Sequence, residues 1–415
     1  MRVLPKRRVS AVIALAVYSS SVSLAASPHR NQLAVPKPEE RIQVEPLGYR
    51  PPGALYMLTE RAFTSLDFID AHHLLFTFHQ PRLMQREAHP DRRDNDQVIK
   101  AVVLGLPGGN TVTSTEWRMH DRARYLWSLG DGRFLVREKN TFYLTDASLK
   151  LHPYLEIPTT VLTSDVSPDG HTLVVEHEFE KHSPDQHTRL LQQAEKFGDS
   201  PPPEDTQVTL INVASREVLS ALRTDVPVHI PVTSNGYVSV AKEKTGKVTD
   251  QFVVRFQPFQ GDPVVLGRVA STCSPHEYFL DQKALMIESC GPRSADVYLD
   301  AWTTEGKKLW NGQRDGRLVW PNFAFAPGGG RFAESLLSVS HDVDLLDSIT
   351  DEDVRGQVVQ VYDCKSGALL MKVGASPVMA AGQNFALSAD GERLAVLHDG
   401  AIEIYEVPAP AKPEP

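Results

Sequence analysis

Histidine and glutamate residues lie close together in the stretch VVEHEFEKHSPDQH, where they are candidate metal ligands. The histidines are His177, His182 and His187, and the neighbouring carboxylates are Glu176, Glu178 and Glu180. A zinc site needs imidazole nitrogens that converge at about 2 Å from one ion. Histidines five residues apart do not share one helical face, and a path from a strand into a loop spreads them further. We therefore predict a solvated loop and no metal site.

Two acidic runs are candidates for calcium binding. The larger run contains Asp342, Asp344, Asp347, Asp351, Glu352 and Asp353, and the smaller contains Asp91, Asp94 and Asp96. Calcium takes six or more oxygen ligands, often from alternating positions around a glycine bend. Neither run has that glycine, and Leu345 and Leu346 interrupt the larger one. We predict solvated acidic loops.

Local signatures of catalysis are absent from the sequence. There is no G-x-S-x-G, no H-E-x-x-H and no glycine-rich phosphate loop after a predicted strand. The PGGGR stretch at 327–331 is rich in glycine, but its position matches a turn that recurs elsewhere in the chain. The sequence therefore assigns no catalytic residue, no metal ligand and no cofactor-binding residue, and it predicts no cofactor.

The chain has three cysteines. Cys273 and Cys290 flank CSPHEYFLDQKALMIESC, which is predicted to form one hairpin, so these two residues are a candidate disulfide across neighbouring strands if the protein is exported. The alternative is that both stay reduced. Cys364 would be an unpaired thiol, half-buried on a strand. No cysteine spacing is typical of a metal site.

Residues 1–26 have the pattern of a signal peptide. The basic residues 6–8 precede an apolar run, and small residues at its end predict cleavage near Ala25 or Ala26. The apolar run is short and is interrupted by serines at 19–21, which argues against a membrane anchor. We expect a secreted or periplasmic protein with no stable membrane insertion after cleavage.

Composition and charge narrow the class of protein. The net charge is -9 and the apolar content is 41%, as in a globular protein without the basic stripe of a nucleic-acid binder. Residues 27–53 form a proline-rich N-terminal leader, and residues 408–415 form a proline-rich tail that we expect to be disordered. The folded body is predicted over 54–407.

Internal repetition is the strongest signal in that body. The turn SPDG at 167–170 recurs as SADG at 388–391 and as PGGG at 327–330, each time between two apolar runs. A second cassette follows each copy, with alternating apolar residues as in QVTLINV from Gln207. About seven units at a spacing of roughly fifty residues predict an all-β, seven-bladed β-propeller with four-stranded antiparallel blades, with six or eight blades as alternatives. Each blade has two apolar faces that only its neighbours can bury.

These turns, together with strand patterns such as Val361-Tyr362-Asp363, resemble those of secreted bacterial YVTN-type and WD-repeat-like propellers over residues 55 to 407. The Gly-His and Trp-Asp pairs of typical WD repeats are missing. The resemblance implies architecture and says little about activity. It also implies that any catalytic groups would converge at the central channel from distant blades, where a single sequence does not reveal them.

The last repeat, AIEIYEV from Ala401, lacks a fourth strand. Propellers commonly complete one blade with a strand from the opposite terminus. The segments ERIQVEPLG at 40–48 and GALYML at 53–58 are the two candidates, and either would join the ends of the ring as a clasp.

Three insertions, at 80–97, 179–206 and 336–357, are predicted between the second and third strands of their blades, and 185–198 has the apolar spacing of a short helix. Long loops on a rigid scaffold often carry function. The sequence favours an exported, non-catalytic scaffold that binds a protein or a small ligand on one rim. The alternatives are a propeller-type enzyme, a lactonase or other hydrolase with its site at the central channel, and an accessory domain of envelope assembly.

Overall fold

The computed structural model describes residues 36–51, 64–80, 97–120, 124–179, 206–224, 230–246, 248–293, 296–343, 349–379 and 383–410 of the 415-residue chain. Several predictions fall outside these residues: the signal peptide at 1–26, the alternative clasp strand at 53–58 and the helix at 185–198. Within the described part of the chain, no helix is long and apolar enough to cross a membrane.

The strands of the first half of the chain form three antiparallel sheets of four strands each. Blade 1 contains β2 (Ser65–Phe68), β3 (His73–His79), β4 (Gln97–Gly105) and β5 (Thr111–Met119). Blade 2 contains β6 (Leu126–Gly130), β7 (Arg133–Glu138), β8 (Thr141–Thr145) and β9 (His152–Glu156). Blade 3 contains β10 (Val161–Val166), β11 (Thr172–Glu178), β12 (Thr206–Asn212) and β13 (Val218–Thr224).

Four further sheets follow along the chain. Blade 4 contains β14 (Gly236–Lys244), β15 (Asp250–Pro258) and β16 (Val264–Ser271). Blade 5 contains β17 (His276–Phe279), β18 (Ala284–Cys290), β19 (Val297–Thr303) and β20 (Lys308–Arg314). Blade 6 contains β21 (Leu318–Ala326), β22 (Arg331–Val339), β23 (Val354–Asp363) and β24 (Leu369–Ala375). Blade 7 contains β25 (Phe385–Leu387), β26 (Arg393–His398), β27 (Ala401–Glu406) and β1 (Glu40–Gln43).

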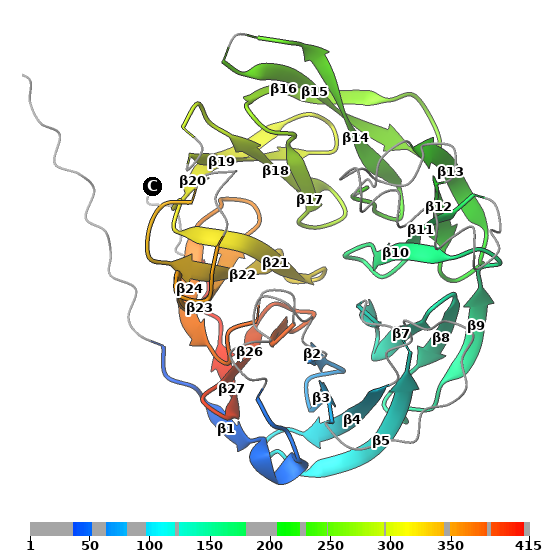
Figure 1. Ribbon diagram of the computed structural model, residues 1–415, viewed down its shortest axis with the longest axis vertical. Coiled ribbons are helices and arrows are strands. Elements are labelled where there is room, and N and C mark those ends of the chain that lie inside the picture. The colour runs from blue at the N-terminus through cyan, green and yellow to red at the C-terminus, as the bar shows by residue number, and fades with distance from the viewer. Residues whose placement is uncertain are drawn as a thin grey trace, which may run out of the picture. The chain divides into compact units, whose positions relative to one another are not determined.

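The seven sheets are arranged in a ring with the first strand of each four-stranded blade innermost (Figure 1), so the prediction of an all-β, seven-bladed β-propeller is confirmed. Among the described residues, blade 4 is the one sheet with three strands. Its innermost position is occupied by residues 230–233, which contribute only a single bridge, between Val232 and Tyr237. Pro231 lies beside this bridge and has no N–H to give to a ladder, which accounts for the short pairing.

The ring is closed by the predicted clasp, which uses the first of the two candidate segments. Strand β1 pairs antiparallel with β27, with Ile42 opposite Ile402. Val44 and Tyr49 continue inward, and the ring of Tyr49 lies 5.4 Å from that of Phe76 on β3 in blade 1. Part of the segment 27–53 therefore belongs to the propeller, which begins before residue 54.

The recurring SPDG turn connects the first two strands of a blade. In blade 3 the backbone N–H of Gly170 donates to the carbonyl of Ser167 (2.8 Å), and in blade 7 Gly391 donates to Ser388 in the same way. Gly170 has φ +73°, and a Cβ there would lie 2.3 Å from the carbonyl oxygen of Leu129 in blade 2. Asp169 Oδ2 accepts a hydrogen bond from the backbone N–H of Ser234 (3.1 Å) near blade 4. The turn is therefore architecture that also joins neighbouring blades.

The three predicted insertions lie after the second strands of blades 1, 3 and 6, namely β3, β11 and β22, although the third is shorter than predicted because 336–339 belong to β22 and 354–357 to β23. Because strands alternate in direction, these loops leave the ring at the end opposite the first-to-second-strand turns. We call these ends the insertion rim and the turn rim. Most residues of the first two insertions lie outside the described ranges.

The cysteines lie in blades 5 and 6. Cys273 and Cys290 form a disulfide (S–S 2.06 Å), which joins the segment before β17 to the end of β18. Cys364 is 1% exposed, so the expectation of a half-buried thiol is wrong. Its sulfur packs between blades 5 and 6, where burial raises the pKa of the thiol.

Candidate ligand site in the central channel

The histidine and acidic clusters noted in the sequence do not converge where they are described. His177 lies on β11, and its ring nitrogens contact the hydroxyls of Thr159 (2.8 Å) and Thr209 (2.9 Å) within blade 3. In the third insertion, the carboxylate of Asp353 accepts hydrogen bonds from Thr350. Across the described residues, no three His, Cys, Asp or Glu side chains are placed to hold a metal ion. His182, His187 and the smaller acidic run lie outside those residues.

A cavity of about 310 Å³ lies in the central channel. Every blade contributes to its lining through its innermost segment, namely β2, β6, β10, residues 230–232, β17, β21 and β25, together with adjoining turn residues. The lining includes residues 130–132, 167–169 and 327, which belong to first-to-second-strand turns, so the cavity extends toward the turn rim. Propellers commonly enclose a central channel, and such concave sites suit small ligands.

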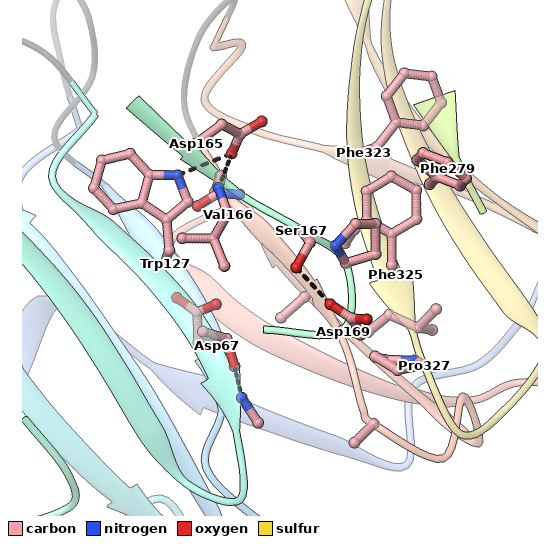
Figure 2. Close-up of a pocket in the computed structure, with 18 of the residues that line it drawn as sticks. Asp67, Trp127, Asp165, Val166, Ser167, Asp169, Phe279, Phe323, Phe325 and Pro327 are labelled. Atoms are coloured by element: carbon pink, nitrogen blue, oxygen red, sulfur yellow. Dashed lines mark hydrogen bonds between the residues drawn. The ribbon is translucent and has the colours of Figure 1, made fainter. Parts of the chain in front are cut away.

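Blades 1 to 3 form one wall of this cavity, which we call the acidic wall because it carries Asp67 and Asp165 (Figure 2). Asp165 at the end of β10 accepts three hydrogen bonds on one oxygen, Oδ1: from Trp127 Nε1 (3.0 Å), from Arg124 Nη1 (3.4 Å) and from the backbone N–H of Val166 (2.9 Å). The Arg124 guanidinium also lies 5.3 Å from the centre of the Trp127 ring. These contacts fix the carboxylate while Oδ2 stays clear of them. Asp165 keeps 45% of its side chain exposed.

Asp67 on β2 belongs to the same wall. Its Oδ2 accepts a hydrogen bond from Ser65 Oγ (2.6 Å), two residues earlier on the same face of the strand. Burial raises the pKa of Asp67 to about 6, although the Ser65 hydrogen bond and the nearby Arg124 charge both lower it. At neutral pH Asp67 is ionised in most molecules, and its carboxylate is poorly solvated because it is buried.

The opposite wall is aromatic and comes from blades 5 and 6 (Figure 2). Phe323 and Phe325 project from β21 with their rings stacked at 6.0 Å, and Tyr278 of β17 lies 4.3 Å from Phe323. Phe279 is fully buried beside Tyr278 and packs toward blade 4, and Pro327 continues the wall into the turn. Phe323 and Phe325 are half-buried, so part of each ring faces the cavity. An acidic wall thus faces an aromatic one.

Sequence reasoning missed these residues because they converge from seven repeats. Asp67, Trp127, Asp165 and Phe323 lie in the first strand of their blades, shortly before the turn. Alignment of the repeats on their turns brings these first-strand positions together: Asp67, Trp127 and Asp165 in the first three blades, and Tyr278 and Phe323 in the fifth and sixth.

A second perturbed carboxyl lies just outside the cavity. Glu277 precedes Tyr278 on β17 and points to the other face of the strand, the one where Phe279 packs on Phe256 of blade 4 (6.3 Å between ring centres). The side chain is 7% exposed, and its Oε1 has no hydrogen-bond partner among the described residues. Burial raises the pKa of Glu277 to about 8. It is therefore protonated in the folded protein at neutral pH.

The wild-type protein should lose stability at high pH because Glu277 ionises there, and we expect Glu277→Gln to abolish this loss. The folded-state pKa is above the unfolded value, so the favourable contribution of Glu277 is complete below about pH 4.5 and is lost as the pH rises to about 8. The loss in wild type is on the order of 5 kcal/mol. Urea unfolding at pH 5 and pH 9 measures it: the variant should match wild type at pH 5 and exceed it at pH 9. The exposed Glu217→Gln is the control, and an equal pH dependence in wild type and Glu277→Gln would contradict the assignment.

No family model and no curated protein matches the chain. Solved structures that resemble it include acylaminoacyl peptidase from Pyrococcus horikoshii, at 12% identity and TM-score 0.48, covering 80% of this chain and 48% of that one. The β-propeller domain of the Trilobed protease from Pyrococcus furiosus has 10% identity and TM-score 0.44, with 84% and 92% covered. Hydrazine synthase from Kuenenia stuttgartiensis has 11% identity and TM-score 0.41, with 87% and 99% covered. The chain spans about half the length of the peptidase structures.

Proposed function

We propose that this protein is an exported, non-catalytic binding propeller that holds a ligand in its central cavity. The observation that carries the proposal is the cavity of about 310 Å³, lined by the innermost segments of all seven blades and divided into an acidic and an aromatic wall. A concave site with an apolar surface and a few positioned polar groups is the usual form of a small-molecule site. Export rests on the N-terminal pattern at 1–26, and membership among secreted YVTN-type propellers rests on the SPDG and SADG turns.

The chemistry of the lining favours binding over catalysis. The described residues that line the cavity include no histidine, cysteine or lysine, so the groups there that could act as acid or base are the four aspartates and Tyr278. Ser167, a hydroxyl in the lining, donates to Asp169 within its own turn, as Ser388 donates to Asp390 in blade 7. Its hydrogen bond therefore belongs to the repeated turn. The enzyme alternative is tested by the same experiment, because a catalytic channel would convert a bound ligand.

The test compares wild type with a variant whose cavity is filled. Ser128 lies in the lining with an exposed side chain, so Ser128→Trp adds bulk to the cavity without replacing a core residue. A set of anionic, cationic and neutral aromatic fragments is screened by ligand-observed NMR, with mass spectrometry of each mixture after incubation. We expect at least one class to bind wild type and to lose binding in Ser128→Trp, with no fragment converted.

The control variant is Ser215→Trp, which places the same side chain on the exposed turn between β12 and β13, the two outer strands of blade 3. It should bind fragments as wild type does. Binding that survives in Ser128→Trp would place the ligand elsewhere and contradict the proposal. Conversion of a fragment by wild type, lost in Ser128→Trp, would establish the enzyme alternative in its place.

A further inference from the structure

We infer that the ligand of the cavity is an organic ammonium with an apolar body, held by its cationic nitrogen on the wall of Asp67 and Asp165 and by its body on Phe323 and Phe325. This inference rests on the proposed function and specifies its chemistry. It is carried by three independent features of the lining: its charge balance, the free oxygens of its carboxylates and the position of its aromatic rings.

The charge balance of the lining is negative. Its described residues include four aspartates, Asp67, Asp131, Asp165 and Asp169, and one cationic residue, Arg124. The Arg124 side chain contacts Asp165, lies against Trp127 and also lowers the pKa of Asp67, so its single charge is shared between two of the four aspartates. An anionic ligand would meet carboxylates in a place of reduced solvation, which is unfavourable, whereas a cation would offset them.

The carboxylate geometry leaves acceptor positions for such a cation. All three donors to Asp165 converge on Oδ1, and the single side-chain donor to Asp67 binds Oδ2. Asp165 Oδ2 and Asp67 Oδ1 therefore keep lone pairs that no hydrogen bond in the described structure uses. An ammonium group carries up to three N–H donors and no acceptor, which complements two carboxylate oxygens. Charge-assisted hydrogen bonds of this kind are stronger than neutral ones.

The aromatic wall indicates the chemistry of the rest of the ligand, the part that carries no charge. Phe323, Phe325 and Tyr278 present ring surface across the cavity from the aspartates, as Figure 2 shows for the two phenylalanines. Rings in this position bury an aliphatic or aromatic body and also attract a nearby cation through their faces. The cavity volume of about 310 Å³ is at the small end for ligand pockets, so a single small ring with a short amine arm fits better than a polymer.

Calorimetric titration with a matched probe series tests the inference on the full-length protein. The probes are 2-phenylethylammonium, its neutral analogue 2-phenylethanol, the anion 3-phenylpropionate, and methylammonium, which lacks the ring. We expect 2-phenylethylammonium to bind about ten- to a hundredfold more tightly than 2-phenylethanol, since a hydrogen bond to a charged partner has that effect. Methylammonium and 3-phenylpropionate should bind more weakly than both. An N-acetylated Phe-Lys amide carries its amine on a peptide side chain. Comparison of its affinity with that of 2-phenylethylammonium shows whether the ligand is a peptide amine or a free amine.

Variants assign the selectivity to the acidic wall. In Asp67→Asn/Asp165→Asn the preference for 2-phenylethylammonium over 2-phenylethanol should disappear while 2-phenylethanol still binds, and the exposed Glu217→Gln should keep it. Arg124→Gln removes the positive charge beside Asp165 and should therefore strengthen ammonium binding. This second variant keeps the inference testable if the double variant fails to fold.

Equal affinity of the ammonium and the alcohol for wild type, or absence of ammonium binding at millimolar concentration, overturns the inference. If 3-phenylpropionate or 2-phenylethanol then binds and Ser128→Trp blocks it, the proposed function stands and only the ammonium assignment fails. If no probe is blocked by Ser128→Trp, both fail.

Discussion

Ile42→Asp is expected to destabilise the protein by on the order of 4 kcal/mol, because it opens the clasp that closes the ring. Ile42 is 6% exposed and lies in the cluster that fills the space between blades 7 and 1, together with Tyr49, Phe76 and Phe78. An aspartate there would bury a charge and remove a packed side chain. Because β1 is held mainly by β27 and this cluster, its loss would expose an unpaired edge of blade 7 as well.

The neighbouring position on the same strand supplies a matched control. Gln43 also pairs with β27 but points outward and is exposed, so Gln43→Asp introduces the same carboxylate without burying it. Urea unfolding of the two variants beside wild type measures the difference. We expect Gln43→Asp to remain close to wild type. A comparable loss in both variants would show that charge on β1, and not packing of Ile42, governs closure.

Deletion of residues 40–58 should lower the melting temperature sharply, and an unchanged melting temperature would refute the clasp.

The clasp could be predicted from the sequence because it concerns the order of repeats. AIEIYEV ends the chain's last repeat one strand short, so a strand from elsewhere was required, and the apolar residues Ile42 and Val44 alternate as a strand needs. The same reasoning left 53–58 as an equal candidate. What favours β1 is its continuation, since Tyr49 packs on Phe76 and Phe78 and Lys100 donates to the carbonyl of Leu47 (2.8 Å). Such long-range contacts leave no local pattern.

The candidate site was less accessible to sequence reasoning for a related reason. The histidine and acidic clusters drew attention because they are dense in the chain, yet His177 is tied to threonines of its own blade. Asp67, Asp165 and Phe323 lie in three different repeats, and none of them differs by itself from an ordinary strand residue. The ring brings them together, so the fold, once predicted, indicates which strand positions to compare but not how their side chains meet.

The second large effect is expected at a buried ion triad between blades 5 and 6. Arg314, at the end of β20, lies with Nη1 2.7 Å from Glu288 of β18 and with Nη2 against Glu334 of β22. Arg314 is 4% and Glu334 2% exposed. Burial raises the pKa of Glu334, and Arg314 opposes that rise; for Arg314 itself, burial would lower the pKa, but the two carboxylates raise it above the usual value. Each charge therefore depends on the others.

Arg314→Met should destabilise the protein by about 3–5 kcal/mol at pH 8, since it leaves two buried carboxyls without a cation. In the variant the folded-state pKa of Glu334 would rise further above its unfolded value, so the deficit should grow as the pH rises and should be smaller at pH 5. Urea unfolding at the two pH values measures this. Arg317→Met, three residues on and 57% exposed, is the matched control and should change little.

The triple variant Arg314→Met/Glu288→Gln/Glu334→Gln separates charge from packing. Replacing a whole buried ion cluster by neutral groups is often close to neutral in free energy, because the desolvation penalty disappears together with the attraction. We therefore expect the triple variant to recover most of the stability lost in Arg314→Met, and to lose its pH dependence. A deficit that is equal at both pH values and is not rescued would mean that the stem of Arg314 acts by filling space.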